Sequence, residues 1–392
     1  IAIECAYQVI IALLRSRYAD FDQRTIVSVD RGQYGWVEFI HHQPCRSPAS
    51  VRRFYKLAGM QLALVHALRG EDYHFDNLIA CDDQPLLIDH ECLCGGRTTR
   101  KAGPRFADHI AYDELYAASV LATSMVPRWV GTPSGRRVDV SGLGNHRRQQ
   151  TDSTVQEWHG VNTDRMNLST VPAIYRSSLN TVELDGERVD PVLHCDDLIR
   201  GFRAMYDWLL ADRDDLFAQH AAVMESPDTA TIRDVRRTTE EYVRMIRALA
   251  SPKLQHCGLR ASLLLSHLHD ADDPESARRE QRDLLACDIP YFTSATRSSV
   301  ADLFSRMTEV DRDRQCAILE ASFQMIDASS HGIDRICTAG PDAAGGVVQS
   351  PREKVIEIAC LIERMAVMHR DPDGGPSAAW IVPSLHVESD TW

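Results

Sequence analysis

Three residues in one short stretch have side chains suited to moving a phosphoryl group. Asp72 and Asn77 lie five positions apart, and Asp89 follows after a short apolar segment. Phosphoryl transfer needs a group that orients or deprotonates the attacking hydroxyl, and oxygen ligands that hold Mg²⁺ on the phosphates. Asp72 can supply the first function, and Asn77 and Asp89 can supply the ligands. The structural alternative is that these residues only form turns and cap a strand.

His74 lies in the same loop and is a further candidate. An imidazole at this position can orient Asp72 or contact a phosphate. It can equally be a packed, hydrogen-bonded scaffold residue. The sequence leaves both roles open.

The segments around these residues are predicted to be alternating helices and hairpins. Apolar residues recur at helical spacing over 3–14 and again over 51–65. Runs rich in β-branched and aromatic residues predict one hairpin over 25–40, and apolar stretches on both sides of the turn at 81–84 predict a second. The order of helix, hairpin, helix, polar loop, hairpin and Asp is that of a kinase core, from its lobe-bridging helix to its metal-binding aspartate.

The rest of the chain is expected to be mainly helical. From residue 107 onward the apolar pattern is mostly helical, with loop-rich interruptions near 131–155, 158–193 and 338–350. The stretch 370–378 has the Pro, Gly and charge content of a linker. The fold class is therefore α+β and mainly α-helical.

The composition excludes several classes of protein. With 392 residues, 44% apolar and 25% charged, the chain can bury one large core or two moderate ones. A formal charge of -13 argues against general nucleic-acid binding, and no stretch approaches the roughly 20 apolar residues that a membrane span needs. Eleven cysteines without a secretory signal indicate a reducing compartment. We therefore expect a cytoplasmic protein with neither nucleic acid nor membrane as a partner.

Spaced motifs over residues 1–325 resemble the dehydratase domain of class II (LanM-type) lanthipeptide synthetases. The resemblance is carried by motifs rather than by single residues. They are Tyr34-Gly35-Trp36-Val37-Glu38, Phe54-Tyr55 with Gly59, Asp72-x-His74-x-x-Asn77-Leu78-Ile79-Ala80, Pro85-Leu86-Leu87-Ile88-Asp89-x-Glu91, Asn162-Thr163-Asp164-x-Met166, Gly201-Phe202 with Tyr206, Arg233-x-Val235-x-Arg237-x-Thr239-x-x-Tyr242, and Asp288-Ile289-Pro290-Tyr291-Phe292.

This resemblance implies a kinase-like fold, of the lipid-kinase-like kind, with a truncated small lobe and a large helical lobe. Residues 1–45 would be the C-terminal part of the small lobe and the hinge. Residues 46–369 would be the large lobe of the dehydratase domain. Residues 370–392 would be a linker towards a C-terminal cyclase domain, whose zinc-ligand motifs do not occur in this sequence.

The resemblance also implies lanthipeptide dehydration, in which ATP and Mg²⁺ phosphorylate Ser/Thr of a precursor peptide with a leader and a Ser/Thr/Cys-rich core. The phosphorylation residues of the family correspond to Asp72, His74, Asn77, Asp89 and Glu91. Asp72 would assist the hydroxyl, while Asn77 and Asp89 would hold Mg²⁺ on ATP. Glu91, two positions after Asp89 on an expected strand, would face the same side as a further ligand or an anchor behind the ligands.

Elimination of the phosphate requires a second group, because the α-proton must leave while the departing oxygens are stabilised. A guanidinium suits those oxygens better than an ammonium does. The elimination pair of the family corresponds to Arg233 and Thr239, with Arg237 as a second phosphate ligand. From composition alone, this segment is instead a solvated basic turn at the start of a helix. The match at five spaced positions favours elimination.

One residue expected of a kinase-like enzyme is missing, since no lysine occurs before Lys56. Such enzymes place a lysine of the small lobe on the nucleotide phosphates, so the isolated chain is expected to be inactive. Two alternatives remain open. One is a small-molecule or lipid-type kinase that never eliminates, against which the run from Arg233 to Tyr242 argues. The other is an inactive, peptide-binding fragment.

Overall fold

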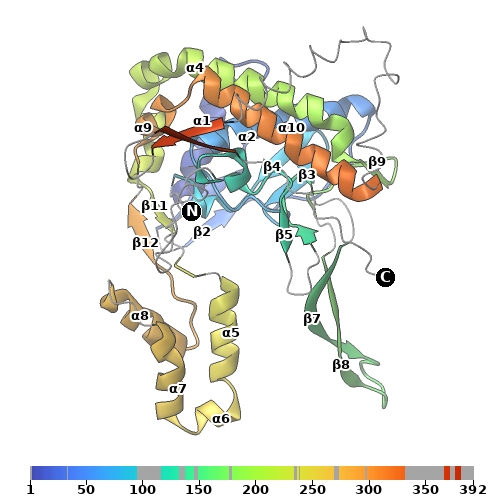
Figure 1. The fold of residues 1–392 in the computed structure, drawn as a ribbon, viewed down its shortest axis with the longest axis vertical. Coiled ribbons are helices and arrows are strands. Elements are labelled where there is room, and N and C mark those ends of the chain that lie inside the picture. The colour runs from blue at the N-terminus through green and yellow to red at the C-terminus, as the bar shows by residue number, and fades with distance from the viewer. Residues whose placement is uncertain are drawn as a thin grey trace.

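Helices and short antiparallel sheets alternate along the chain in the computed structural model (Figure 1). The α+β, mainly helical class expected from the sequence is confirmed. The structure describes residues 2–32, 34–94, 116–131, 137–144, 149–175, 179–233, 236–237, 239–268, 273–295, 298–331, 366–370 and 376–380.

The helices dominate the described part of the chain. They are α1 (Ala2–Arg17), α2 (Pro48–Ala67), α4 (Cys195–Met224), α5 (Thr239–Leu249), α6 (Pro252–Gln255), α7 (Gly258–Leu265), α8 (Pro274–Leu285), α9 (Val300–Ser305) and α10 (Glu309–His331). Single 3₁₀ turns are η1 (His90–Cys92), η2 (Val120–Thr123), η3 (Pro191–His194), η4 (Ser226–Thr229) and η5 (Ser266–Leu268).

Each strand pairs antiparallel with one neighbour in a two-stranded sheet. The pairs are β1 (Ser28–Asp30) with β2 (Gly35–Val37), β3 (Leu78–Cys81) with β4 (Gln84–Leu87), β5 (Trp129–Gly131) with β6 (Arg137–Asp139), β7 (Gln149–His159) with β8 (Asn167–Tyr175), β9 (Glu183–Leu184) with β10 (Glu187–Arg188), β11 (Thr231–Arg233) with β12 (Thr293–Ala295), and β13 (Ala366–Arg370) with β14 (Pro376–Trp380).

The main core forms where α2 crosses α4, and two glycines allow the close approach. A Cβ added at Gly59 would lie 1.9 Å from the carbonyl oxygen of Leu198, and one added at Gly201 would lie 1.9 Å from that of Lys56. Both distances are far below contact, so any larger residue would force the helices apart. Helices α1 and α10 also pack against α4. We call this part of the molecule, with its shared core, the body.

Helix α2 begins and ends where its sequence predicts. The hydroxyl of Ser47 accepts a hydrogen bond from the backbone N–H of Ser50 at 3.2 Å, and Pro48 occupies the first helical turn, where its missing N–H costs nothing. The backbone N–H of Gly70 returns to the carbonyl of Val65 at 2.8 Å and closes the last turn. The position at which the polar loop leaves α2 is therefore held by backbone hydrogen bonds.

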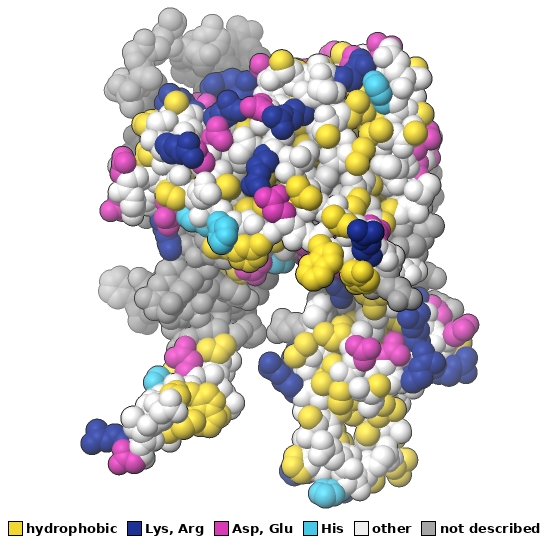
Figure 2. Space-filling model, turned by 180° about the vertical axis from the view of Figure 1, so that it is seen from behind, with side chains coloured by type: hydrophobic (Ala, Val, Ile, Leu, Met, Phe, Trp, Pro, Cys, Tyr) yellow, Lys and Arg dark blue, Asp and Glu magenta, His cyan; other side chains and the backbone are white. Residues whose placement is uncertain are grey.

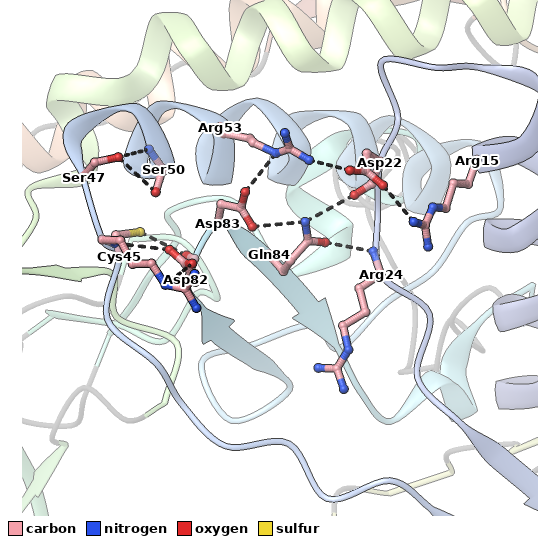
Figure 3. Close-up of polar contacts among 11 residues, drawn as sticks. Arg15, Asp22, Arg24, Cys45, Ser47, Ser50, Arg53, Asp82, Asp83 and Gln84 are labelled. Carbon is pink, nitrogen blue, oxygen red and sulfur yellow. Dashed lines mark hydrogen bonds and ion pairs between the residues drawn. The ribbon is translucent and has the colours of Figure 1, made fainter.

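The far end of the β3–β4 hairpin is tied to α2 by a polar network (Figure 3). The guanidinium of Arg53, on α2, bridges Asp83 at 3.0 Å and Asp22 at 2.7 Å. The side chain of Gln84 donates to the backbone carbonyl of Asp22 and accepts from the backbone N–H of Arg24. The turn is thus held by polar contacts. The open end of the hairpin is the end at which Asn77 and Asp89 lie.

Helices α5 to α8 form a separate small unit, which we call the satellite. It lies below the body in Figure 1 and is joined to it by β11 and β12. Its core is a separate cluster with few fully buried side chains, namely Tyr242, Leu249, Ala261, Leu265, Leu268 and Leu284. Figure 2 shows further hydrophobic side chains on its surface, and Leu259 and Leu263 of α7 are exposed.

Three sheets occupy the stretches expected to be loop-rich. Strands β5 to β10 lie within 129–188, and the long β7–β8 hairpin projects from the body (Figure 1). The expectation of loops at 131–155 and 158–193 is therefore wrong in part. The expected loop at 338–350 lies outside the described residues. Strand β14 lies inside the expected linker and pairs with β13.

No described helix is both long enough and apolar enough to cross a membrane. The cysteines that the structure describes are all free thiols, and several, such as Cys45, Cys94 and Cys316, are buried. A buried free cysteine behaves as a small apolar core residue.

Candidate active site

The loop after α2 places Asp72 in a conformation that few residue types tolerate. Its φ is 72°, in the left-handed region where Asn and Asp are the favoured residues after Gly. The side-chain amide of Asn77 donates to the backbone carbonyl of Asp72 at 2.8 Å, and the backbone N–H of Asn77 donates to the carbonyl of His74 at 2.9 Å. Asn77 thus fixes the loop that carries Asp72.

The β3–β4 hairpin brings the two expected metal ligands to the same end. Leu78 pairs with Leu87, so Asn77 lies directly before the pairing and Asp89 shortly after it. The backbone N–H of Ile88 donates to the carbonyl of Asn77 at 3.0 Å and holds the two strand ends together. Asn77 and Asp89, twelve positions apart in sequence, therefore lie at the same end of the hairpin.

The position of Glu91 differs from the expectation. Strand β4 ends at Leu87, Asp89 has a φ of 60°, and His90 to Cys92 form the 3₁₀ turn η1. The alternation of side chains along a strand does not apply to such a turn. The sequence pattern predicted that both residues lie on a strand, and that premise is wrong. The side chain of Glu91 instead binds Arg233.

The first residue of η1, His90, anchors the turn in the body. The ring of His90 is 1% exposed and its Nδ1 lies 2.8 Å from the hydroxyl of Tyr73. The ring of Tyr7, from α1, packs against it with centroids 4.0 Å apart. Burial lowers the pKa of His90 to about 4, so the imidazole is neutral at physiological pH. This anchor was not recognised from the sequence, because a lone His carries no pattern.

Burial and neighbouring carboxylates raise the pKa values of Asp72 and Asp89. Partial burial raises the pKa of Asp72, and the charge of Asp89 adds to the rise while that of His74 opposes it. Partial burial also raises the pKa of Asp89, together with the negative charges of Glu91 and Glu4. His74 Nε2 lies 3.8 Å from Asp72 Oδ1. The site therefore carries more negative charge than its surroundings neutralise, which favours a cation.

The available donors fit a magnesium ion that is bound mainly by phosphates. No three His, Cys, Asp or Glu side chains among the described residues come together as a metal cage. Mg²⁺ on a nucleotide needs only one or two protein oxygens besides phosphates and waters. Asp89 offers a carboxylate, and the amide of Asn77 has its nitrogen engaged and its oxygen left as the ligating atom.

The elimination candidates Arg233 and Thr239 are in contact. Arg233 ends β11, which pairs with β12 in the register Arg233 to Thr293. Its Nη2 donates to the hydroxyl oxygen of Thr239, the first residue of α5, at 3.3 Å. Its Nη1 donates to Glu91 Oε1 in an ion pair whose side chains are 17% and 26% exposed.

The ring of Tyr291 lies on another side of the same guanidinium. The distance from the Arg233 Cζ to the ring centroid is 5.8 Å, within cation–π range. Burial and the charge of Glu91 raise the pKa of the Tyr291 hydroxyl. Tyr291 was recognised in the sequence only as part of a family motif, whereas the structure places it beside Arg233. Glu4, whose charge acts on Asp89, was not singled out at all.

Arg237 lies in a different environment from Arg233. Its Nε donates to Glu280 Oε1 at 3.2 Å, and the hydroxyl of Tyr242 donates to the same oxygen. The Glu280 side chain is 3% exposed. These contacts join α5 to α8 inside the satellite, so they show Arg237 as a packing residue of that unit.

Comparisons with known proteins identify a family and a relative of this chain. Residues 1–295 match a family model described as a domain of unknown function, DUF4135. The chain is 22% identical over 279 residues to the lacticin 481/lactococcin biosynthesis protein LcnDR2 of Lactococcus lactis subsp. lactis. That match covers 70% of this chain and 29% of the relative, so the chain spans less than a third of that protein. Both findings support the resemblance to class II synthetases.

Proposed function

The chain belongs to the family of the DUF4135 domain, and from that premise we propose that it carries the dehydration site of a class II lanthipeptide synthetase, which acts on a precursor peptide. In this proposal a kinase-like site phosphorylates Ser/Thr with ATP, and the phosphate is then eliminated to give dehydroalanine or dehydrobutyrine. The substrate is a precursor peptide with a leader and a Ser/Thr/Cys-rich core, modified in the cytoplasm. The similarity to a lantibiotic biosynthesis protein supports lanthipeptide modification in general.

For phosphorylation, Asp72 orients the peptide hydroxyl and accepts its proton. Its half-exposed carboxylate lies beside His74, which orients it. Asn77 and Asp89 would hold Mg²⁺, which neutralises charge on the phosphates of ATP when it is bound. Asp72 and Asp89 both have a left-handed backbone, with φ of 72° and 60°.

For elimination, a general base removes the α-proton of the phosphorylated residue, and the electron pair of the Cα–H bond forms the Cα–Cβ double bond. The Cβ–O bond breaks, and its electron pair leaves with the phosphate. Arg233 and the hydroxyl of Thr239 bind the departing oxygens, because their 3.3 Å contact places two donors at one point. Arg237 is assigned no direct role, since it is engaged with Glu280.

One observation carries the proposal more than any other. The ion pair between Arg233 and Glu91 joins the phosphorylation candidates to the elimination candidates across 142 positions of sequence. A phosphorylated side chain formed beside Asp89 would need to move little to reach Arg233. A kinase that only transfers phosphate has no need for such an arrangement, and this argues for two steps at one site.

The test is to replace Asp72 with Asn in the full-length protein. Asn tolerates the left-handed backbone, so the fold is retained while the carboxylate is lost. We expect phosphorylation to fall by roughly a hundredfold or more, on the scale of general-base loss. Mass spectrometry of the Ser/Thr/Cys-rich peptide encoded beside the gene, incubated with Mg²⁺ and ATP, gives the readout.

The matched control is Asp185→Asn. Asp185 also has a positive φ, of 54°, but lies in the exposed turn between β9 and β10. It should leave the product pattern unchanged. Full dehydration by the Asp72 variant would refute the assigned role, and a wild-type protein that accumulates phosphopeptide without dehydration would indicate a kinase that does not eliminate.

A further inference from the structure

Glu91 lies at the point where the two halves of the candidate site meet. It belongs to η1, which immediately follows Asp89, yet its carboxylate oxygen Oε1 binds Arg233 of β11. The two side chains are mostly buried, at 26% and 17% exposed. A pair this shielded from solvent is stronger and better defined in geometry than a surface ion pair.

The contacts of Arg233 show what this pair does to the guanidinium. Nη1 is bound to Glu91, Nη2 points to the hydroxyl of Thr239, and the ring of Tyr291 lies against the plane. An arginine side chain has many rotamers, and ordering it has an entropic cost. Glu91 therefore fixes in advance which edge of the guanidinium faces Thr239.

We propose that Glu91 is a positioning residue of the elimination step, which holds Arg233 towards Thr239, rather than a ligand of Mg²⁺. The inference rests on the proposed dehydration and assigns Glu91 to its second step. The 3₁₀ turn supports it, because the alternation of side chains along a strand, which would have turned Asp89 and Glu91 to the same side, does not apply in η1. The buried anchor of His90 on Tyr73 holds that turn in place.

The experiment is a double-mutant cycle in the full-length protein with Glu91→Gln, Arg233→Ala and the combined variant. The probes are Mg²⁺, ATP and the Ser/Thr/Cys-rich peptide encoded beside the gene, and mass spectrometry follows the phosphorylated and dehydrated forms over time. We expect Glu91→Gln to slow elimination by roughly 10- to 100-fold, as loss of a supporting hydrogen bond does at other sites. Phosphopeptide should therefore accumulate.

The cycle separates a positioning role from a merely structural one. If Glu91 acts through Arg233, then Glu91→Gln in the Arg233→Ala background should change elimination by less than about twofold, because coupled residues are not additive. Fully multiplicative effects would overturn the inference. Glu91→Asp, which keeps the charge, should restore part of the elimination rate, and no restoration beyond Glu91→Gln would also count against it.

A second readout distinguishes Glu91 from a metal ligand. The Mg²⁺ concentration for half-maximal phosphorylation should be unchanged in Glu91→Gln but raised in Asp89→Asn. An increase in both variants would make Glu91 a ligand and overturn the inference. Glu187→Gln, on exposed β10, is the matched control and should match wild type in both readouts. A wild-type protein that neither phosphorylates nor dehydrates the peptide would instead overturn the proposed function, and this inference with it.

Discussion

The body and the satellite contribute to one site but are held together by different forces. The body has an extensive core in which α2 and α4 approach closely at Gly59 and Gly201. The satellite buries only a small cluster and relies on buried polar pairs such as that of Arg237 and Glu280. Phosphorylation candidates therefore lie on the part with the larger core, and Thr239 lies on the part with the smaller one.

Because of this difference, we expect local unfolding to affect the phosphorylation candidates and the elimination candidates differently. Regions with few buried apolar contacts open at lower free energy than a large core does. Asp72 and Asp89 should keep their geometry until the body unfolds. The contact of Arg233 with Thr239 crosses between the two units and should be lost when the satellite alone opens.

One of the two largest effects is expected from Gly201→Ala in the body. The added Cβ would meet the backbone carbonyl of Lys56, which cannot move without separating α2 from α4. We expect a loss of about 3 kcal/mol in the free energy of unfolding, at the upper end for overpacking. Chemical denaturation measures it, and both groups of the site should be affected together.

Gly258→Ala is the control for this variant. A Cβ at Gly258, the first residue of α7, meets nothing within 4 Å. Its effect should lie between neutral and a stabilisation of about 0.5 kcal/mol. Equal destabilisation by the two variants would contradict the close helix crossing as the source of body stability.

A second prediction separates the satellite from the body. Glu280→Ala removes the buried acceptor of both Arg237 and Tyr242 and leaves a guanidinium without its partner. We expect the satellite to lose about 3 kcal/mol, the typical cost of breaking a buried pair. Hydrogen exchange should increase in α5 and α8 while α2 and α4 remain protected.

The exposed Glu275, in the first turn of α8, provides the comparison. Glu275→Ala should cost no more than about 0.5 kcal/mol, the contribution of a carboxylate near a helix N-terminus. If Glu280→Ala increased exchange equally in α2, the satellite would not be a separate cooperative unit.

The smallest expected effect concerns Asp311, which joins α10 to α2 and α4. Its Oδ2 accepts from the hydroxyl of Tyr206 at 2.8 Å and contacts His66 Nε2 at 3.2 Å. Burial on its own raises the pKa of Asp311, but these hydrogen bonds and one from Gln315 outweigh it and lower that pKa. We expect Asp311→Asn to cost about 1 kcal/mol in the free energy of unfolding at neutral pH.

The lowered pKa fixes the sign of the pH dependence. The ionised Asp311 contributes its full stabilisation above its unfolded pKa of about 3.9 and loses it as the pH falls through the lower folded value. Denaturation curves of wild type and Asp311→Asn should therefore converge below pH 4. A difference that stayed constant down to pH 2 would show that the charge is not involved.

Local sequence determined the elements that carry the phosphorylation candidates. Helical spacing of apolar residues predicted α1 and α2. A run of β-branched and aromatic residues predicted the β1–β2 hairpin, and apolar stretches on both sides of the turn at 81–84 predicted the β3–β4 hairpin. The sequence also placed Asn77 and Asp89 at the open end of one hairpin. By contrast, the β7–β8 hairpin is rich in polar residues and largely exposed around its tip, so no alternation of burial marks it.

Only the tertiary structure determined the direction of the Glu91 side chain and its contact with Arg233. The direction of the Glu91 side chain depends on the 3₁₀ turn η1, which His90 anchors on Tyr73. It does not follow from the alternation of side chains along a strand. The meeting of Glu91 with Arg233 depends on the pairing of β11 with β12, whose strands are about sixty positions apart. Local propensity extends over a few residues, whereas these contacts are set by the packing of elements distant in the chain.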